Sequence, residues 1–450
     1  MIGLNKIGLN QVQLNRLHLN APFPAYGKMA GGGGSGDGFP QLPGDVTRWH
    51  FGGLTNEMMA AMDDPRIEDA DGKGRFLSFK NFAWKEGSGI SDIYPGALVF
   101  DGVDDYGTCN NFPILTKEKG YTVVVLRQWD QDFLNTTLTG GLLSTRNYST
   151  GEGVAFEKIE SSNKGYWNLG AGGIIDFAKS PFTWQTSKQY NNVGILKGDK
   201  NHGKPLCVGS GLSGGQQCGR FAIWELVFLD HDATEEELTK IKDYFVKTYP
   251  WLFPDQAWTV VGKTNEDEDR ATIANITGNG NDLVCLNLGF IEGSGYNEEG
   301  EYAGYLVTDG VDDKITSSTF EMGNDWTVIG DWELINTGKN DNAGIVKFDS
   351  IVIYNYNPIL INIKNGRNNL IPDQNTVNAI CSDGRIYSKD WKESIYNEET
   401  ESTSKNLLTI GYSGNSYTKI AFKNLAIYPT VLSKEDCIKA YNYLQTLKAK

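Results

Sequence analysis

Short runs of β-branched and aromatic residues dominate the hydrophobic pattern of this chain. Examples are residues 123–126, 222–229, 351–354 and 359–363, and clusters of Gly, Asn and Asp separate such runs. Short apolar runs between turn-forming residues are typical of strands, because Gly, Asn and Asp supply the backbone geometry that a chain reversal needs. Many short strands with few helices predict an all-β fold of antiparallel β-sandwiches, of the jelly-roll kind.

A helical pattern occurs once near the end of each half of the chain. Thr234 and Glu237 have the spacing of a capping box, and Leu238, Ile241 and Phe245 then fall on one helical face. We expect each sandwich to end in a short α-helix that packs onto it. The second half repeats this arrangement with Ser433, Asp436, Cys437, Ala440 and Leu444.

The landmarks of the first half return in the same order in the second half. Residues 96–105 read GALVFDGVDD, residues 304–313 read GYLVTDGVDD, and an EGSG phrase precedes both. Landmarks that keep their order over such a distance indicate duplicated domains rather than a short-period solenoid. We assign the two domains to residues 49–255 and 256–450. A feature that one copy lacks is then not needed by the shared scaffold.

Residues 1–20 form four five-residue units, each with an aliphatic second residue, a fourth residue Leu and a final Asn. Because five is odd, the apolar side reverses at each unit boundary, so a continuous strand cannot keep one face buried. The units resemble rungs of a pentapeptide-type β-helix, and one coil cannot bury its own apolar edges. A disordered tail that happens to repeat is the alternative. We expect docking on another protein or on copies of the same chain, through Ile2, Leu4, Asn5, Ile7, Leu9, Asn10, Val12, Leu14, Asn15, Leu17, Leu19 and Asn20.

Residues 21–48 have the composition of a flexible linker. Four consecutive glycines end at Gly34, and Pro40 and Pro43 follow. Gly-rich segments behave as flexible chains, so this linker would tether residues 1–20 to the sandwiches.

The net charge of −15 argues against nucleic acid and anionic membranes as partners, because both select basic surfaces. Asn at positions 5, 10, 15 and 20 interrupts any signal-peptide core, and no apolar stretch approaches the length of a membrane span. Six cysteines without CxxC spacing favour free thiols in a reducing cytosol, with a Cys207–Cys218 bridge left open. We therefore expect a protein made in a cytosol, without a signal peptide.

Together these phrases resemble the concanavalin A-like, laminin-G-like family of β-sandwiches. The likeness rests on a strand that enters DGVDD, a following strand that reads YTVVV or WTVI, and the closing strand and helix of each copy. Residues 277–283 read TGNGNDL, and this phrasing is similar to virion proteins of phages of gut Bacteroidetes, including crAss-like phages. The resemblance implies two jelly rolls that bind carbohydrates or protein partners, in a fibre, tail or capsid-decoration protein.

Some members of this family hydrolyse glycans, and in that branch one strand carries the motif E-x-D-x-E, which places its carboxylates on one face. Neither copy contains the motif. Asp230 and Asp232 have the right spacing, but Pro429 and Val431 stand in the corresponding places. We therefore expect no catalytic residues, and a glycan-degrading enzyme with other carboxylates is the alternative.

The DGVDD phrases could bind a cation. Many members of the family bind Ca²⁺ at the rim of the sandwich, and carboxylate oxygens are the ligands that Ca²⁺ prefers. Asp and Gly are also the residues that a tight turn needs. We favour the turn role and expect no cofactor, with Ca²⁺ as the alternative. The residues concerned are Asp101, Asp104, Asp105, Asp309, Asp312 and Asp313.

Aromatic residues in the variable middle of each copy are the candidates for glycan binding, since an aromatic face can pack against the C–H groups of a sugar. Aromatic side chains are also common in protein cores. The candidates are Trp167, Trp184, Tyr190, Tyr354, Tyr356, Tyr387 and Trp391.

The function expected from the sequence is adhesion by a phage virion protein. Residues 1–20 would attach it to capsid, portal, tail or fibre subunits, and the two domains would face host-surface or mucosal glycans. A homo-oligomer or multicopy assembly would supply avidity, because each sugar contact is weak. A structural spacer or decoration protein that binds only other virion proteins is the alternative.

Overall fold

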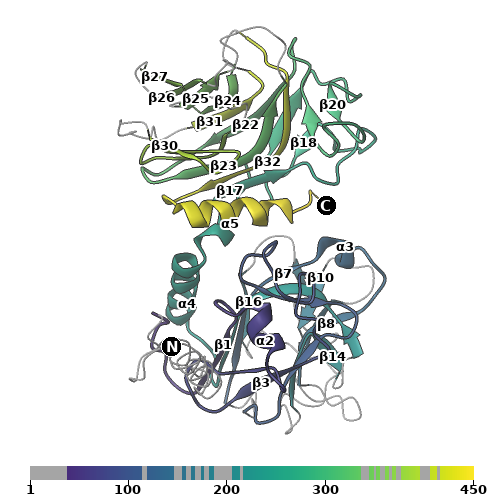
Figure 1. Ribbon diagram of the computed structural model, residues 1–450, viewed down its shortest axis with the longest axis vertical. Helices are drawn as coiled ribbons and strands as arrows, with labels where there is room; N and C mark the ends of the chain where they lie inside the picture. Colours follow the sequence, from purple (N-terminus) through teal and green to yellow (C-terminus); the bar gives the residue numbers. More distant parts are fainter. Residues whose placement is uncertain are drawn as a thin grey trace, which may run out of the picture.

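The computed structural model shows an all-β protein built as two stacked units (Figure 1). It describes residues 38–449, apart from 114–118, 146–154, 159–163, 168–173, 177–181, 187–204, 213–215, 336–343, 349–350, 355–359, 364–366, 371–376, 396–405 and 413–415. Within these residues helices are few, and none is both long enough and apolar enough to cross a bilayer. The helices are α2 (Asn56–Ala60), α3 (Gln131–Leu134), α4 (Glu235–Thr248), η2 (Pro250–Leu252) and α5 (Lys434–Gln445).

The first unit is a sandwich of two sheets formed by strands β1 to β16. One sheet has the order β12-β7-β16-β5-β4, with β1 also paired to β16. The other has the order β11-β10-β9-β8-β13-β6-β3-β2, with β14 and β15 beside β8. The strands are β1 (Val46–His50), β2 (Arg66–Glu68), β3 (Phe76–Lys80), β4 (Gly89–Ile90), β5 (Leu98–Asp101), β6 (Tyr106–Cys109), β7 (Thr122–Trp129), β8 (Gly140–Ser144), β9 (Ala155–Lys158), β10 (Lys164–Trp167), β11 (Ile174–Asp176), β12 (Phe182–Thr186), β13 (Leu206–Val208), β14 (Ser210–Leu212), β15 (Gln216–Cys218) and β16 (Arg220–Leu229).

The second unit is a sandwich formed by strands β17 to β32. Its sheets have the orders β20-β21-β32-β23-β28-β29-β30, with β17 on β32, and β18-β19-β22-β31-β24-β25-β26-β27. The strands are β17 (Gln256–Thr259), β18 (Thr272–Ile273), β19 (Leu283–Leu286), β20 (Gly295–Tyr296), β21 (Leu306–Val307), β22 (Lys314–Phe320), β23 (Thr327–Leu334), β24 (Gly344–Phe348), β25 (Ile351–Tyr354), β26 (Leu360–Ile363), β27 (Arg367–Leu370), β28 (Val377–Cys381), β29 (Arg385–Ser388), β30 (Glu393–Ile395), β31 (Asn406–Ile410) and β32 (Ile420–Tyr428).

Hydrophobic residues from both sheets fill each sandwich. In the first unit, Val123 and Val125 of β7 share one buried cluster with Leu77 and Phe79 of β3 in the opposite sheet. This alternation is what a strand between two layers requires, since successive side chains point to opposite faces. A separate buried cluster fills the second unit, with members that include Leu283, Ile315, Val328, Trp332 and Leu408.

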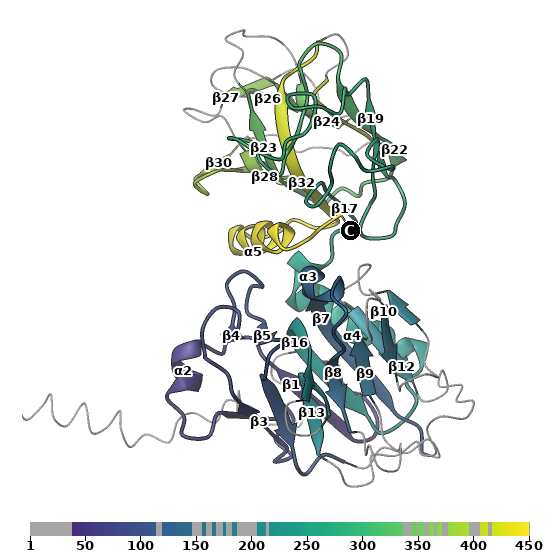
Figure 2. The ribbon, with the colours of Figure 1, turned by 90° about the vertical axis from the view of Figure 1, so that its right-hand side faces the viewer.

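A third buried cluster joins the two units. Val124 and Leu126, the alternate positions of β7, belong to it together with Leu238 of α4 and Ala440 of α5. All eight residues of β7 are therefore buried, because each face of the strand is covered. Figures 1 and 2 show α5 between the two sandwiches in both views. The two units thus share a hydrophobic interface in addition to their own cores.

Both long helices begin at the caps that the sequence predicted. The Thr234 hydroxyl accepts a hydrogen bond from the Glu237 backbone N–H (3.3 Å), and the Glu237 carboxylate accepts one from the Thr234 N–H (2.7 Å). Ser433 accepts in the same way from the Asp436 N–H at 3.1 Å. These bonds satisfy backbone donors that would otherwise lack partners at the helix start.

The first strand starts within the last residues of the predicted linker. β1 begins at Val46 and runs antiparallel to β16. Upstream of it, the Phe39 ring packs edge-on against Tyr244 at 5.1 Å and lies under the Arg48 guanidinium at 4.4 Å. The described chain therefore enters against the first sandwich, beside α4.

Strands β7 and β23 occupy equivalent places in the two copies. Val125 and Gly330 share one register position, and Arg127 and Trp332 share the next one on the same face. A Cβ atom on Gly330 would overlap the Trp332 ring. In the second copy, Gly330 therefore leaves room for the buried ring of Trp332, whereas the first copy has the side chain of Val125 at this register position.

Candidate functional site

The acidic turn of the first copy is held by its own carboxylates. Asp101 accepts a hydrogen bond from the Val103 N–H at 2.7 Å. Asp105 accepts one from the Asp101 N–H (3.1 Å) and one from the Ser88 hydroxyl (3.1 Å). A carboxylate that binds the N–H two residues on forms an Asx turn, so these aspartates have a structural role.

The second copy repeats this geometry. Asp309 accepts from the Val311 N–H at 2.7 Å, and Asp313 accepts from the Asp309 N–H (2.8 Å) and the Ser294 hydroxyl (2.7 Å). The shared EGSG phrase thus supplies a serine that anchors each turn from outside.

Each turn also has the donor set for a small cation. One oxygen from each of Asp101, Asp104 and Asp105 lies within 4.8 Å of the others, and Asp309, Asp312 and Asp313 are arranged alike. The buried Oδ1 of Asp313 accepts no hydrogen bond from the described residues, whereas both oxygens of Asp105 do accept one. Ca²⁺ therefore fits the second turn better than the first.

Burial shifts the ionisation of both inner aspartates. It raises the pKa of the Asp105 carboxyl to about 6, and it also raises the pKa of Asp313. In both turns the remaining two aspartates add to the rise, because like charges disfavour a further negative charge.

Only part of the predicted aromatic set falls within the described side chains. Tyr387 is fully buried, accepts a hydrogen bond from Arg385 (3.0 Å) and packs in the cluster between the units, so its ring has no surface for a sugar. Trp391 is half-buried against Tyr441, with ring centroids 5.7 Å apart. Strands β10, β12 and β25 carry Trp167, Trp184 and Tyr354, whose side chains lie outside the description, as do Tyr190 and Tyr356 entirely. The docking residues between Ile2 and Asn20 lie outside it as well.

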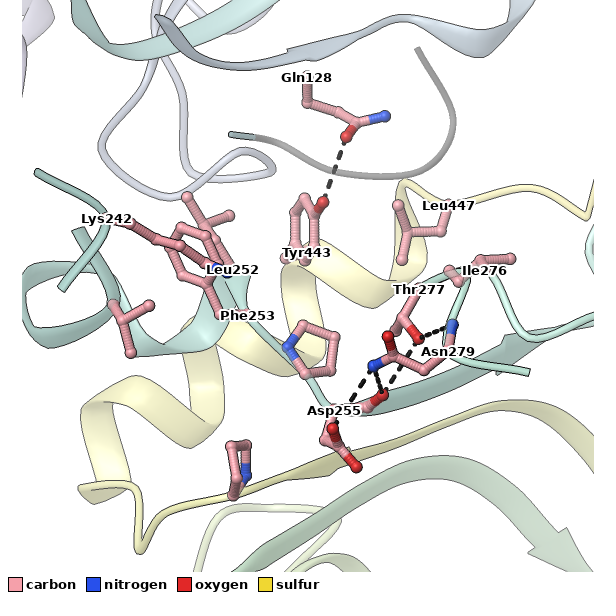
Figure 3. A pocket seen from close by; sticks show the side chains of 13 residues that line it. Gln128, Lys242, Leu252, Phe253, Asp255, Ile276, Thr277, Asn279, Tyr443 and Leu447 are labelled. Carbon is pink, nitrogen blue, oxygen red and sulfur yellow. Dashed lines mark hydrogen bonds between the residues drawn. The ribbon is translucent and has the colours of Figure 1, made fainter. Parts of the chain in front are cut away.

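A cavity of about 320 Å³ lies at the boundary between the two sandwiches (Figure 3). Gln128 of β7 and Lys242 and Val246 of α4 line it from the first unit. Tyr443 and Leu447, from α5 and the residues after it, line it from the second. The cavity therefore exists only because the two units are joined.

One wall of the cavity is apolar. Leu252, Phe253 and Pro254 form it in the segment that connects α4 to β17, whereas Ile276 lies beside Thr277 and Asn279 (Figure 3) and Pro429 also lines the cavity. Such a wall favours a ligand with its own apolar face, because contact removes both surfaces from water.

The opposite wall carries hydrogen-bonding groups on the loop after β18. The Thr277 hydroxyl and the Asn279 amide both donate to the backbone carbonyl of Asp255, at 3.1 and 2.7 Å (Figure 3). These bonds fix the loop and leave the amide oxygen of Asn279 as an acceptor, while the Asp255 carboxylate already accepts from the amides of Asn279 (3.4 Å) and Gln256 (3.1 Å). Lys242 of α4 adds an ammonium donor on the side of Leu252 (Figure 3). The cavity thus combines an apolar surface with polar groups at fixed positions.

The first copy also contains a buried polar network. Oε1 of the fully buried Glu225 lies 2.7 Å from Nδ1 of His50 and accepts a hydrogen bond from the Tyr249 hydroxyl at 2.9 Å. Arg48 donates to Glu225 (3.5 Å) and to the Tyr244 hydroxyl (3.1 Å). Burial raises the pKa of Tyr249, so its hydroxyl remains a donor.

Other residues stand at the positions of this network in the second copy. Asn424 stands in the register position of Glu225, and Thr259 and Ala257 replace His50 and Arg48. The network joins β1, β16 and α4 of the first unit without lining the cavity at the boundary. We therefore assign it to the stability of that unit.

Neither the cavity nor the network was predicted from the sequence. The loop after β18 belongs to the TGNGNDL phrase, which the sequence offered as a family likeness and not as a site. Gln128 and Tyr443 lie 315 residues apart and belong to no sequence motif, so no sequence pattern indicated their contact.

The comparisons with known proteins give distant structural similarities. No protein-family model and no curated protein matches this chain. Among solved structures, a Trypanosoma rangeli sialidase is 8% identical, with a TM-score of 0.31 over 84% of this chain and 68% of that chain. The botulinum neurotoxin serotype D binding domain is 9% identical, with a TM-score of 0.28 over 78% of this chain and 93% of that chain. Identities and TM-scores this low do not support a shared ligand or a shared activity. The proposed function therefore rests on the geometry of the site.

Proposed function

We propose that this protein is a non-enzymatic adhesion protein that binds glycans through the cavity between its two sandwiches. The observation that carries the proposal is the lining of this cavity, which combines apolar side chains with amide, hydroxyl, carboxylate and ammonium groups. Sugars present the same combination, since a pyranose ring has C–H faces and a rim of hydroxyl groups. Neutral or N-acetylated saccharides fit this lining best, because the Asp255 carboxylate and the Lys242 ammonium give it no net charge.

The size of the cavity supports a small binding unit. Pockets for small molecules have volumes of about 300 Å³ or more, so a cavity of about 320 Å³ accommodates one or two sugar rings at the end of a chain. A contact of this size is weak, and useful adhesion then requires several copies of the protein on one particle.

The setting that we propose is a phage virion. Support for it comes from the DGVDD and TGNGNDL phrases, and from the repeated units of residues 1–20 followed by a Gly-rich linker. In this proposal residues 1–20 attach the protein to a multicopy assembly, either on other virion proteins or on copies of itself, and the sandwiches face host-surface or mucosal glycans. The net charge of −15 keeps such a protein from binding nucleic acid.

A glycan array probed with the full-length protein tests the proposal. We expect binding to a subset of neutral or N-acetylated glycans, and we expect Lys242→Ala to weaken it about tenfold, the effect of losing about 1.4 kcal/mol. Lys247→Ala on the same helix is the matched control, because Lys247 is exposed and does not line the cavity.

Two other outcomes would assign a different function. Binding to capsid or tail proteins without binding to any glycan would indicate a structural spacer. Continuous release of reducing ends from a polysaccharide would indicate an enzyme.

A further inference from the structure

Four aliphatic side chains lie exposed on one edge of the second sandwich. They are Val284 and Leu286 on β19, Ile291 in the following loop and Val311 at the tip of the acidic turn, with exposed fractions of 42, 36, 64 and 71%. We call these four residues the aliphatic edge. Exposed aliphatic residues that gather in one place mark interaction sites more often than isolated ones do.

Hydrogen bonds hold the three segments of the aliphatic edge together. β19 pairs with β22, so Leu286 lies opposite Lys314, the first residue after the turn. The Asn287 amide donates to the carbonyl of Asp312 at 2.9 Å, and the Ser294 hydroxyl donates to Asp313 at 2.7 Å. The strand, the loop and the turn therefore form one preorganised surface (Figure 2 shows β19 beside β22).

The first copy has the same backbone arrangement and keeps the exposed valine of the turn, Val103, but lacks the other three aliphatic side chains. There Asn81 donates to the carbonyl of Asp104 at 3.0 Å, as Asn287 does to Asp312. Counting from this asparagine, Ser78, Lys80 and Lys85 stand where the second copy has Val284, Leu286 and Ile291. The scaffold therefore does not need aliphatic residues at these positions, so their presence points to a function of the second copy.

The surroundings of the aliphatic edge are acidic. Residues 282–314 contain eight acidic residues and a single cation, Lys314. A partner for this surface should present aliphatic side chains together with positive charge and few carboxylates. The acidic residues are Asp282, Glu292, Glu298, Glu299, Glu301, Asp309, Asp312 and Asp313.

Residues 1–20 have this chemistry. Their four units carry eight aliphatic residues, with Lys6 and Arg16 as charged residues and no Asp or Glu. The segment is too short to bury its own apolar residues. We propose that residues 1–20 of one copy bind the aliphatic edge of a second copy, an inference that rests on the proposed multicopy function.

The place where the described chain begins favours binding between copies. Phe39 packs on the first sandwich, whereas the aliphatic edge belongs to the second. Each copy thus offers a segment at one end and its binding surface on the other unit. Such a head-to-tail contact is heterologous and builds a ring or an open filament.

The test measures the mass of the full-length protein by sedimentation velocity over a range of concentrations. The double variant Leu286→Lys with Ile291→Lys installs the lysines that the first copy already carries at these positions, so we expect it to fold. The wild type should associate, and this variant should remain a monomer. Leu9→Asp with Leu14→Asp in the segment should have the same effect.

Ile395→Lys is the matched control, because Ile395 is 66% exposed on β30 of the same sandwich but lies outside the aliphatic edge. We expect it to associate as the wild type does. A synthetic peptide of residues 1–20 should bind the Leu9→Asp, Leu14→Asp protein, and should bind the lysine variant at least tenfold more weakly.

Either of two results would overturn the proposal. One is a wild type that stays monomeric at its highest soluble concentration, and the other is association that the lysine substitutions leave unchanged. Glycan binding is measured on the same variants and should persist in all of them, so failure of this inference and failure of the proposed function are separable.

Discussion

The Tyr443 hydroxyl in α5 donates a hydrogen bond of 3.2 Å to Oε1 of Gln128 in β7, across 315 residues of sequence. Both side chains are buried and both line the cavity between the sandwiches. In the first copy the corresponding tyrosine, Tyr244, bonds to Glu225 within its own unit at 3.3 Å. The duplicated helix therefore uses one tyrosine to stabilise a unit and the other to join two units.

Tyr443→Phe should destabilise the protein by about 1–3 kcal/mol, because it leaves the buried Gln128 oxygen without its donor. Urea unfolding at pH 7 measures the change. Tyr417→Phe is the control, since that ring is half-exposed, and its effect should stay within about 0.5 kcal/mol. Equal stability of the two variants would show that the contact between the units contributes nothing.

Gly330→Ala should destabilise the second sandwich by about 2 kcal/mol or more, because overpacking forces the buried Trp332 out of its position. Gly323→Ala is the matched control, because a Cβ there would make only an ordinary contact of 3.9 Å with the carbonyl oxygen of Asp325. The near-ultraviolet circular dichroism spectrum should report the displaced indole in the first variant only. A fully stable Gly330→Ala protein would contradict the packing described for β23.

Asp105 predicts a dependence of stability on pH. Burial raises the pKa of Asp105 in the folded protein to about 6, above its ordinary value of 3.8. The folded state then binds the proton more tightly than the unfolded state does. The resulting stabilisation is complete below pH 3.8 and is lost as the pH rises through about 6, with a magnitude of about 3 kcal/mol.

Asp105→Asn removes this titration without changing the shape of the side chain. Relative to the wild type, it should therefore gain stability between pH 4 and pH 7, as measured by urea unfolding in the presence of EDTA. Asp104→Asn, at an exposed position, should show a smaller gain, because it removes only one of the like charges that raise the pKa of Asp105. A difference between Asp105→Asn and the wild type that is constant with pH would refute the assigned cause.

Calcium should have little effect on stability, because backbone and serine donors already bind both oxygens of Asp105 and one oxygen of each of Asp101, Asp309 and Asp313. We expect millimolar CaCl₂ to raise the midpoint of thermal unfolding by less than about 1 °C over EDTA. A larger increase that Asp309→Asn abolishes would instead assign a Ca²⁺ site to the second turn.

The sequence predicted those parts of the fold that depend on short-range patterns. The capping box of Thr234 and Glu237 is local, and so is the Asx turn at Asp101, because hydrogen bonds across two or three residues create each of them. The repetition of DGVDD added the division into two similar units. The alternation of short apolar runs with turn-forming residues predicted the all-β class.

The candidate site could not be predicted in this way. Its walls come from β7, α4, the loop after β18 and α5, and only the packing of two finished units brings these segments together. Tyr387 shows the converse case, a residue that the sequence offered for glycan binding and that the fold buries. Its position in a variable segment suggested exposure, but β29 lies against the cluster between the units, and this long-range contact buries the ring.

The most direct test of the glycan-binding cavity is a titration of the full-length protein with the best saccharide from the array, followed by isothermal calorimetry. Val246→Trp would fill the cavity, whereas Lys247→Trp places the same bulk on an exposed position of α4. We predict that Val246→Trp abolishes the heat of binding while Lys247→Trp retains the wild-type affinity. Unchanged affinity in a folded Val246→Trp protein would contradict the account.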